Sequence, residues 1–392
     1  MKIFFELVKV EYRKLLCKKS VGIFTFGIII FIFLSANIID LLSKTSVQDE
    51  KGNFLTYYDV YKRDKASIDE LNGKKINSEL LYEASQNYDL NPTKYYALLE
   101  KIHKVYNNDN ILLTPTEFKT MNYEDFNMFY EKRIEKINDL LQKQGFSKEE
   151  ITYILDMDNK VSKPFTFENV YTYNKYMNLT LTIGMLSLFL ISLIISPIFS
   201  EEYNRNMDSL LLSTKEGKKT LIIAKLFATF SISIIITVSL TLSSLLTLIC
   251  LYGSNGIMAE IQLIAYYLTY DMTILQCIVI VTITSIFGTM LQATICMAVS
   301  SMTRNAIVPT AIAFLSISLC LFNVEGNPFL TKIFSFSPVQ MSNFDYVMKP
   351  IVFNFFGSEI ILYKAVCIVA TFLIIGLSFF SIKRFKNYQI MS

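Results

Sequence analysis

The chain has 392 residues, a net charge of +3 and a hydrophobic fraction of 52%. Its apolar residues gather in long runs, which is not typical of soluble domains and predicts a membrane protein. His103 is the single histidine, and neither a paired-cysteine metal spacing nor a glycine-rich phosphate loop occurs. These features disfavour histidine-based catalysis, a zinc site and ATP hydrolysis by this chain, so we expect no enzyme activity and no bound cofactor.

The N-terminal residues 1–20 predict an amphipathic helix that lies in the membrane interface. Its apolar face carries four residues at helical spacing, namely Phe4, Val8, Tyr12 and Leu15. A second face carries four charged residues, namely Lys2, Glu6, Lys9 and Arg13. The alternative interpretation is a stop-transfer flank of the first span.

Six apolar runs are long enough to cross a hydrocarbon core of ~30 Å, which takes roughly 20 mostly apolar residues. They cover residues 21–42, 176–200, 221–252, 273–299, 306–322 and 360–382. The fifth run is the shortest, and the first has no small-residue cleavage site after it, so we expect a retained span rather than a signal peptide. No run has an ionisable residue near its centre, which disfavours an ion-coupled carrier. The predicted fold class is an all-α polytopic membrane protein with six transmembrane helices.

Lysine and arginine are unevenly divided between the segments that flank these runs. Fourteen of them lie in residues 1–20, 201–220, 301–305 and 383–392. The other short segments, 253–272 and 323–359, hold only Lys332 and Lys349. By the positive-inside rule the first set and both termini are cytoplasmic, and residues 43–175 lie outside. Lysine outnumbers arginine 31 to 6, as in an AT-rich bacterial genome, so we expect the bacterial plasma membrane. Lipids are therefore expected partners, and nucleic acid is not.

Residues 43–175 predict a small external domain of about five helices. Three Ser/Thr–Glu pairs have the spacing of a capping box, namely Ser67 with Glu70, Thr114 with Glu117, and Ser147 with Glu150. Asn91 followed by Pro92 marks a further helix start. None of the six cysteines lies in 43–173, so no disulfide is expected there. We expect Val161–Lys175 to be extended and to lead into the second span.

Two apolar faces are expected inside this domain. The first consists of Tyr95, Leu98, Ile102 and Val105. The second consists of Phe126, Phe129 (or Tyr130), Ile134, Ile137 and Leu141, and Gly145 should end its helix. The many tyrosines of the domain form either an aromatic core or a surface that receives an amphipathic, peptide-like ligand.

Two further regions leave alternatives open. Segment 323–359 is rich in aromatic residues and interrupted by Pro328, Pro338 and Pro350. It predicts short interfacial or re-entrant helices near the external exit, or an interface anchor without a gating role. Spans three and four are rich in serine and threonine, which either allow close helix packing or line a substrate path.

The loop 201–220 begins with two carboxylates, continues to a leucine-rich end and finishes with basic residues before span three. Such a segment suits docking of a partner protein, because its charges set the register and its leucines supply buried area. The candidate contact residues are Glu201, Glu202, Tyr203, Arg205, Asp208, Leu210 and Leu211. The alternative is an ordinary solvated loop.

This loop resembles the first cytoplasmic loop of the ABC-2 family of transporter permeases. The matching residues are Glu201, Glu202, Leu210–Leu212, Ser213, Thr214, Lys218, Lys219 and Lys225. Asn206-Met207 stand where the family often has a glycine, and the resemblance covers roughly residues 1–42 and 174–392. It implies that the loop is a coupling helix that receives an ATPase, with polar contacts through Glu202, Arg205 and Asp208.

The same resemblance implies the function of the chain. It would be the permease subunit of an ATP-binding-cassette exporter, working with two copies of a separate ATPase that binds ATP and Mg²⁺ and with a second permease subunit, identical or related. The expected substrate is amphipathic or hydrophobic, such as a peptide antibiotic, a lipid or a drug. The alternative is a non-transporting subunit that transmits signals or force through its external domain. Four-span permeases with a similarly placed external domain act in this way.

Overall fold

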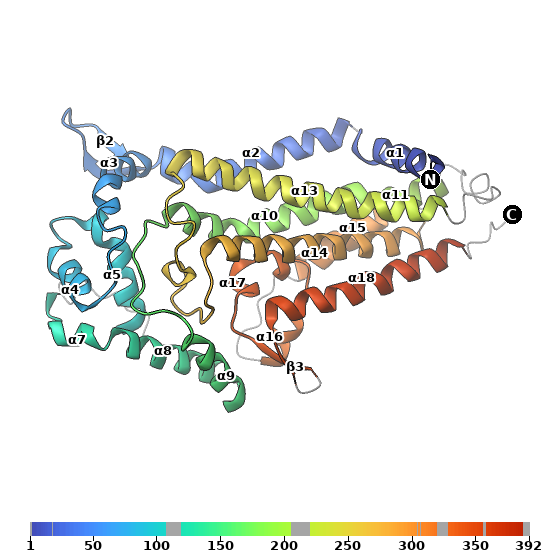
Figure 1. The fold of residues 1–392 in the computed structure, drawn as a ribbon. Coiled ribbons are helices and arrows are strands. Elements are labelled where there is room, and N and C mark those ends of the chain that lie inside the picture. The colour runs from blue at the N-terminus through green and yellow to red at the C-terminus, as the bar shows by residue number, and fades with distance from the viewer. Residues whose placement is uncertain are drawn as a thin grey trace.

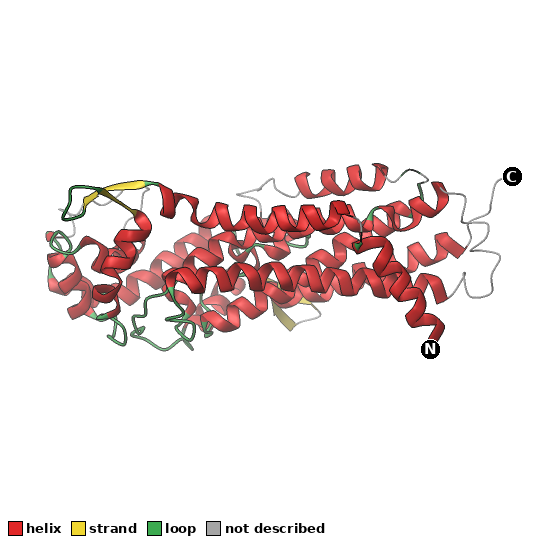
Figure 2. Cartoon of the chain, turned by 90° about the horizontal axis from the view of Figure 1, so that it is seen from above, coloured by secondary structure: helices red, strands yellow, loops and turns green. Residues whose placement is uncertain are grey.

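The computed structural model describes residues 2–17, 19–106, 119–204, 220–303, 305, 307–319, 328–355 and 358–386. It is mostly helical, with two small two-stranded sheets. Its long helices lie side by side in an elongated bundle (Figure 1, and from above in Figure 2). A group of shorter helices covers one end of this bundle, and the N-terminus and the C-terminal end of the last helix lie at the other end.

Among the residues that the structure describes, five helices are long and apolar enough to cross a membrane. They are α2 (Lys19–Leu42), α10 (Tyr171–Ile195, continued by α11, Pro197–Asn204), α13 (Thr220–Tyr252), α14 (Ile274–Ser300) and α18 (Leu362–Lys386). The chain therefore has the helices of a multi-pass membrane protein. Five of the six predicted runs are confirmed as such helices, although α10 begins at Tyr171, inside the stretch expected to be extended.

The predicted run 306–322 corresponds to a shorter helix. α15 (Ile307–Leu319) has 13 residues, and residues 306 and 320–322 lie outside the described part of the chain. At 1.5 Å per residue the described helix is roughly 20 Å long, less than a ~30 Å hydrocarbon core. A sixth span therefore stays a prediction.

Contacts at the helix ends show that α14 and α18 run in the same direction. At the end that carries the shorter helices, the rings of Tyr270, just before α14, and Tyr363, at the start of α18, lie 5.9 Å apart. At the opposite end Ser300 Oγ accepts a hydrogen bond from Phe199 N at 3.2 Å, and Phe385 lies 5.1 Å from the Phe199 ring. The chain between Ser300 and Leu362 must therefore return along the bundle.

The return segment contains α15, α16 (Pro328–Phe334), the 3-10 helix η2 (Gln340–Ser342), α17 (Phe344–Val347) and the hairpin β3–β4 (Val352–Phe355 with Ser358–Ile361). It packs closely on α10 and α14 at two glycines. A Cβ added to Gly184 would lie 2.1 Å from Ser342 Cβ, and one added to Gly288 would lie 2.7 Å from the Pro338 carbonyl oxygen. The short helices expected in 323–359 are present among the described residues, but the hairpin was not predicted.

The shorter helices at the end of the bundle form the described part of the helical domain predicted for residues 43–175. We call it the external domain, and its position outside the cell stays a prediction. It consists of the hairpin β1–β2 (Lys44–Gln48 with Phe54–Thr56) and helices α3 (Tyr57–Asp69), α4 (Ser78–Asn87), α5 (Pro92–Tyr106), α7 (Tyr123–Asn127), α8 (Phe129–Lys143) and α9 (Lys148–Asp158). The described residues thus hold six helices where about five were expected. Neither hairpin was predicted, because both are short and lack a clear alternation of apolar and polar residues.

Three predicted helix starts can be compared with these helices. Ser147 does form a capping box with Glu150 at the start of α9, and α5 begins at Pro92. The predicted cap at Ser67 is wrong, because Ser67 lies inside α3 and Thr56 with Asp59 forms the capping box of that helix. The remaining pair, Thr114 with Glu117, lies outside the described residues.

The two predicted apolar faces form part of the domain core, which also contains the buried residues Leu71, Ile76 and Leu81. Every member of the first face is buried, as are Phe126, Phe129, Ile137 and Leu141 of the second. Ile134 is only half-buried, and a break at Met128 separates α7 from α8. α8 ends at Lys143, two residues before Gly145, as expected.

Candidate functional site

The predicted N-terminal helix, α1 (Lys2–Leu16), packs along the start of α13. Val8 and Leu15 of the predicted apolar face are buried, and the Phe4 ring lies edge-on to the Phe227 ring at 5.8 Å. The Tyr12 hydroxyl donates a hydrogen bond to Ser231 Oγ. The apolar face of α1 is thus used, at least in part, against the protein itself.

Beside this contact, four charged side chains form what we call the Lys225 cluster: Glu11, Lys14, Glu202 and Lys225. Lys225 Nζ donates to Glu202 Oε1 at 2.8 Å, to Glu11 Oε2 at 3.2 Å and to the Ile198 carbonyl at 2.9 Å. Lys14 Nζ donates to Glu202 Oε1 at 2.8 Å and to Glu11 Oε1 at 3.2 Å. The cluster therefore joins α1, α11 and α13 at the end of the bundle where α1 begins and α18 ends (Figure 1).

Three members of the cluster are buried, Lys14 is exposed, and the four charges balance. Lys225 is 0% exposed, Glu11 1% and Glu202 5%. Burial alone would lower the pKa of Lys14, but the carboxylates of Glu202 and Glu11 outweigh it and raise that pKa above its ordinary value. Removing one member of such a group leaves a charge without its partner in a dry environment, which costs about 3–5 kcal/mol.

The structure brings together only part of the predicted contact set of the loop. Glu202 and Tyr203 are buried and Glu201 is half-buried, all three in α11. Arg205, Asp208, Leu210 and Leu211 lie outside the described residues. Because Glu202 points to the two lysines, it holds the start of the loop against α1 and α13 rather than offering an open carboxylate. Glu202 Oε2 has no hydrogen-bond partner among the residues that the structure describes.

The role of Glu11 was not predicted, although the sequence carries two signals for it. Glu11 stands three residues after Val8 and four before Leu15, so it lies on the apolar face of α1. Lys225 lies inside the apolar run 221–252. A charged residue on each of two apolar helix faces indicates a buried ion pair, because neither could be buried alone.

At the opposite end of the bundle, a second group of polar and aromatic side chains joins α2, α10, α13 and the external domain; we call it the tyrosine joint. Asp40 Oδ2 accepts hydrogen bonds from Tyr171 Oη and Tyr252 Oη at 2.9 Å each, and the Lys175 ammonium donates to the same oxygen. Tyr61 of α3 stacks on Tyr171 with ring centroids 4.3 Å apart. The joint therefore connects the domain to three long helices.

A buried arginine fixes the domain to the segment between α13 and α14. Arg133 of α8 is 0% exposed and bonds Asp158 Oδ1 at 2.8 Å. It also donates to the carbonyls of Tyr266 at 2.7 Å and Leu268 at 2.9 Å. Lys163 is the second cation on Asp158, at 2.5 Å. This role was not predicted, although Arg133 stands four residues after Phe129 and four before Ile137 and so lies on the apolar face of α8.

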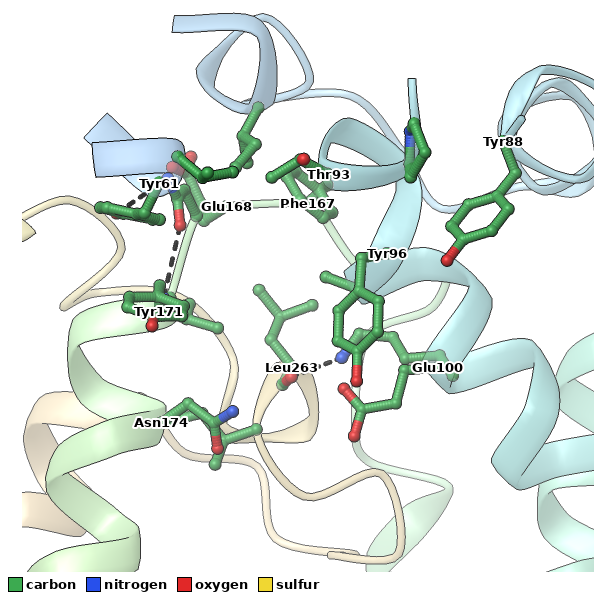
Figure 3. Close-up of a pocket in the computed structure, with 18 of the residues that line it drawn as sticks. Tyr61, Tyr88, Thr93, Tyr96, Glu100, Phe167, Glu168, Tyr171, Asn174 and Leu263 are labelled. Carbon is green, nitrogen blue, oxygen red and sulfur yellow. Dashed lines mark hydrogen bonds between the residues drawn. The ribbon is translucent and has the colours of Figure 1, made fainter. Parts of the chain in front are cut away.

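Between the domain and the tyrosine joint lies a cavity of about 410 Å³. α3 and α5, residues 167–171, the start of α10 and residues 263–266 line it. Figure 3 shows Tyr96 and Glu100 of α5 on one side, Tyr171 and Asn174 of α10 on the other, and Leu263 between them. The Lys101 ammonium donates to the Leu263 carbonyl at this cavity.

Lys101 provides a prediction on pH. Burial lowers the pKa of Lys101 to about 8 from the ordinary 10.5, so the folded protein holds this proton less tightly than the unfolded chain does. The resulting loss of folding stability is complete below pH 8 and disappears as the pH rises through 10.5. The quantity to compare is the midpoint temperature of thermal unfolding of Lys101→Met minus that of the wild type. We therefore expect this difference to decrease as the pH is raised from 7 to 10. Lys104→Met, one turn further along α5, controls for the loss of a lysine, and a difference that grows with pH contradicts the prediction.

The serines and threonines of the long helices are packed together. Thr237 of α13 and Thr289 of α14 share a hydrogen bond of 2.8 Å, and Gln292 Nε2 donates to Ser192 Oγ of α10 at 3.1 Å. The space left between α10, α13, α14 and Ser342 is only about 10 Å³. In this conformation the hydroxyls therefore serve helix packing.

The chain matches no family model, no curated protein and no solved structure. The resemblance to ABC-2 permeases thus remains an expectation, and function must be argued from the geometry. Within the described residues, no group of three or more His, Cys, Asp or Glu side chains could hold a metal ion.

Proposed function

We propose that this chain is the permease subunit of an ATP-binding-cassette exporter, driven by two copies of a separate ATPase and paired with a second permease subunit. The observation that carries the proposal is the Lys225 cluster. It fixes the start of loop 201–220 to α1 and α13 through buried ion pairs. A force applied to this loop would therefore act on the ends of several long helices at once.

The positions of the loop and of the external domain at opposite ends of the bundle support this proposal. One end of the bundle carries α1, α11, the start of α13 and the end of α18. Lysine and arginine concentrate in the sequence segments next to these helix ends, so this is the cytoplasmic end by the positive-inside rule. The external domain lies at the other end, beyond reach of a cytoplasmic ATPase. The tyrosine joint connects that domain to α2, α10 and α13, so both ends act on shared helices.

We further propose six crossings of a bacterial plasma membrane. α14 and α18 run in the same direction, so the segment 301–361 has to return between them. α15 with the close-packed segment from α16 to α17 would complete this crossing. The rival interpretation, a four-span subunit that only transmits force or signals, does not require such a return.

The uncharged side chains between the long helices support a proposal on the substrate class. The described part of each long helix lacks an ionisable residue near its centre, and the hydroxyls between α10, α13 and α14 are uncharged. We therefore propose an amphipathic or hydrophobic substrate, such as a peptide antibiotic, a lipid or a drug. Transport requires a second conformation, because the space of about 10 Å³ between these helices admits no such molecule.

Orientation is tested by labelling single cysteines in a cysteine-free full-length chain. Glu131→Cys, on the exposed face of α8, is expected to react with a membrane-impermeant maleimide in intact cells. Lys9→Cys, on the exposed face of α1, is expected to react only after the cells are opened. The reverse pattern would place loop 201–220 outside and exclude an ATPase there.

The motor is tested by purifying the tagged chain in mild detergent with its candidate ATPase from the same genome. We expect a stable complex with two ATPases per two permease chains. Reversing the charges of Arg205 and Asp208 together is expected to remove the ATPase while the chain stays folded. Arg384→Glu, an exposed residue near the end of α18, is the control and should retain the ATPase. Failure to isolate a complex with any ATPase that carries a phosphate loop would contradict the proposal.

A further inference from the structure

The cavity beneath the external domain has the size and lining of a small-molecule site. Its volume of about 410 Å³ falls within the roughly 300–1,000 Å³ of ligand pockets. Its lining is rich in aromatic side chains, among them Tyr57, Tyr61, Tyr88, Tyr96, Phe167 and Tyr171. Aromatic rings offer apolar surface and a negative face that attracts cations.

The charges on the cavity wall do not all have counterions. Lys104 pairs with Glu100 at 2.7 Å, and Lys101 donates to the Leu263 carbonyl. Glu168 also lines the cavity and is half-buried, yet it has no hydrogen bond or ion pair with any residue that the structure describes. Two charges of the wall therefore lack an oppositely charged partner. They are the Lys101 ammonium, which bonds a carbonyl, and the Glu168 carboxylate, which bonds no described residue.

The surroundings of Glu168 make its negative charge unfavourable in the empty cavity. Burial, together with the nearby carboxylates of Asp69 and Glu260, raises the pKa of Glu168. A positive charge bound beside Glu168 would offset this repulsion. Beside Glu168, an anion would be repelled by this carboxylate and by Asp69 and Glu260, which lie near it without lining the cavity. A neutral apolar molecule would leave the unpaired charge in place.

We infer that the cavity binds an amphipathic cation, a molecule with an aromatic or apolar body and one positively charged centre. Its body would pack on the tyrosine rings and its charge would lie beside Glu168. Two of the rings, Tyr61 and Tyr171, belong to the tyrosine joint, so an occupant touches the contact between the domain and the long helices. This inference does not depend on the proposed transport, because the cavity is formed within one chain.

The test uses two probes of one shape and opposite charge, tetraphenylphosphonium and tetraphenylborate. The full chain is placed in lipid nanodiscs without ATPase or nucleotide, and binding is measured by equilibrium dialysis against empty nanodiscs. We expect saturable binding of tetraphenylphosphonium at one site per chain. Tetraphenylborate is expected to show no saturable binding above the empty nanodiscs.

Two pairs of variants locate the site. Glu168→Gln is expected to weaken binding of tetraphenylphosphonium about tenfold, because it removes the charge and keeps the size. Glu131→Gln, an exposed residue of α8, should bind as the wild type does. Tyr96→Leu is expected to weaken binding severalfold, whereas Tyr123→Leu, which lies outside the cavity, should not.

Three results would each overturn the inference. They are equal binding of both probes, equal affinities of Glu168→Gln and Glu131→Gln, and binding no greater than that of empty nanodiscs. Since no ATPase or nucleotide is present, a failed transport or ATPase assay leaves this measurement unaffected.

Discussion

Replacing Lys225 with methionine is expected to destabilise the folded chain by about 3–5 kcal/mol, because it leaves the carboxylates of Glu11 and Glu202 buried with only Lys14 between them. Methionine has nearly the length of lysine, so packing changes little and the loss reports on charge. The midpoint of thermal unfolding of the purified chain in detergent measures the effect.

A control and a rescue separate the cluster from a general effect of losing a lysine. Lys9→Met, on the exposed face of α1 at the same end of the bundle, is expected to change stability by less than about 1 kcal/mol. Lys225→Met combined with Glu202→Gln should recover part of the loss, because one buried negative charge is then gone. If the double variant is less stable than Lys225→Met alone, the ion pairs do not stabilise this end of the bundle.

Replacing Arg133 with methionine is expected to separate the external domain from segment 253–273, again at a loss of about 3–5 kcal/mol. The variant removes one of two cations from the buried Asp158 and the Arg133 donor from the Tyr266 carbonyl, while the Leu268 carbonyl keeps its hydrogen bond from Gln262. Hydrogen exchange of the full chain should show faster exchange in α8, α9 and segment 261–268, with α14 unchanged.

Arg63→Met provides the matched control in the same domain. Arg63 forms a surface pair with Asp64 at 2.6 Å and is half exposed, so its loss is expected to change stability by less than about 1 kcal/mol. Equal exchange rates in the Arg133 and Arg63 variants would show that the buried arginine does not hold the domain in place. The double variant Arg133→Met with Asp158→Asn should be more stable than Arg133→Met alone.

Much of the fold could be predicted because its signals are local. Apolar runs, a Ser–Glu capping pair and a proline at a helix start depend on residues within a few positions of one another, as at Ser147 and Pro92. The predicted helix start at Ser67 was wrong because a second capping signal lies nearby in the sequence. Ser67 has capping-box spacing, but Thr56 with Asp59 starts that helix eleven residues earlier.

The candidate site could be predicted only in part. Sequence analysis placed Glu202 in the right loop but expected it to contact a partner protein, whereas the described structure pairs it with Lys225 and Lys14. The prediction that the loop receives an ATPase stays untested. Glu168 was not considered, because its importance lies in the lack of a counterion, which only coordinates show.

The sequence alone determined that this chain is a helical, multi-pass membrane protein, since transfer of an apolar run from water depends on composition and length. The tertiary structure decided which charges meet. Lys225 pairs with Glu11 across 214 positions, and Arg133 contacts the carbonyl of Leu268 across 135. No local period encodes such contacts, because burying a charge is favourable only when folding delivers its partner to the same place.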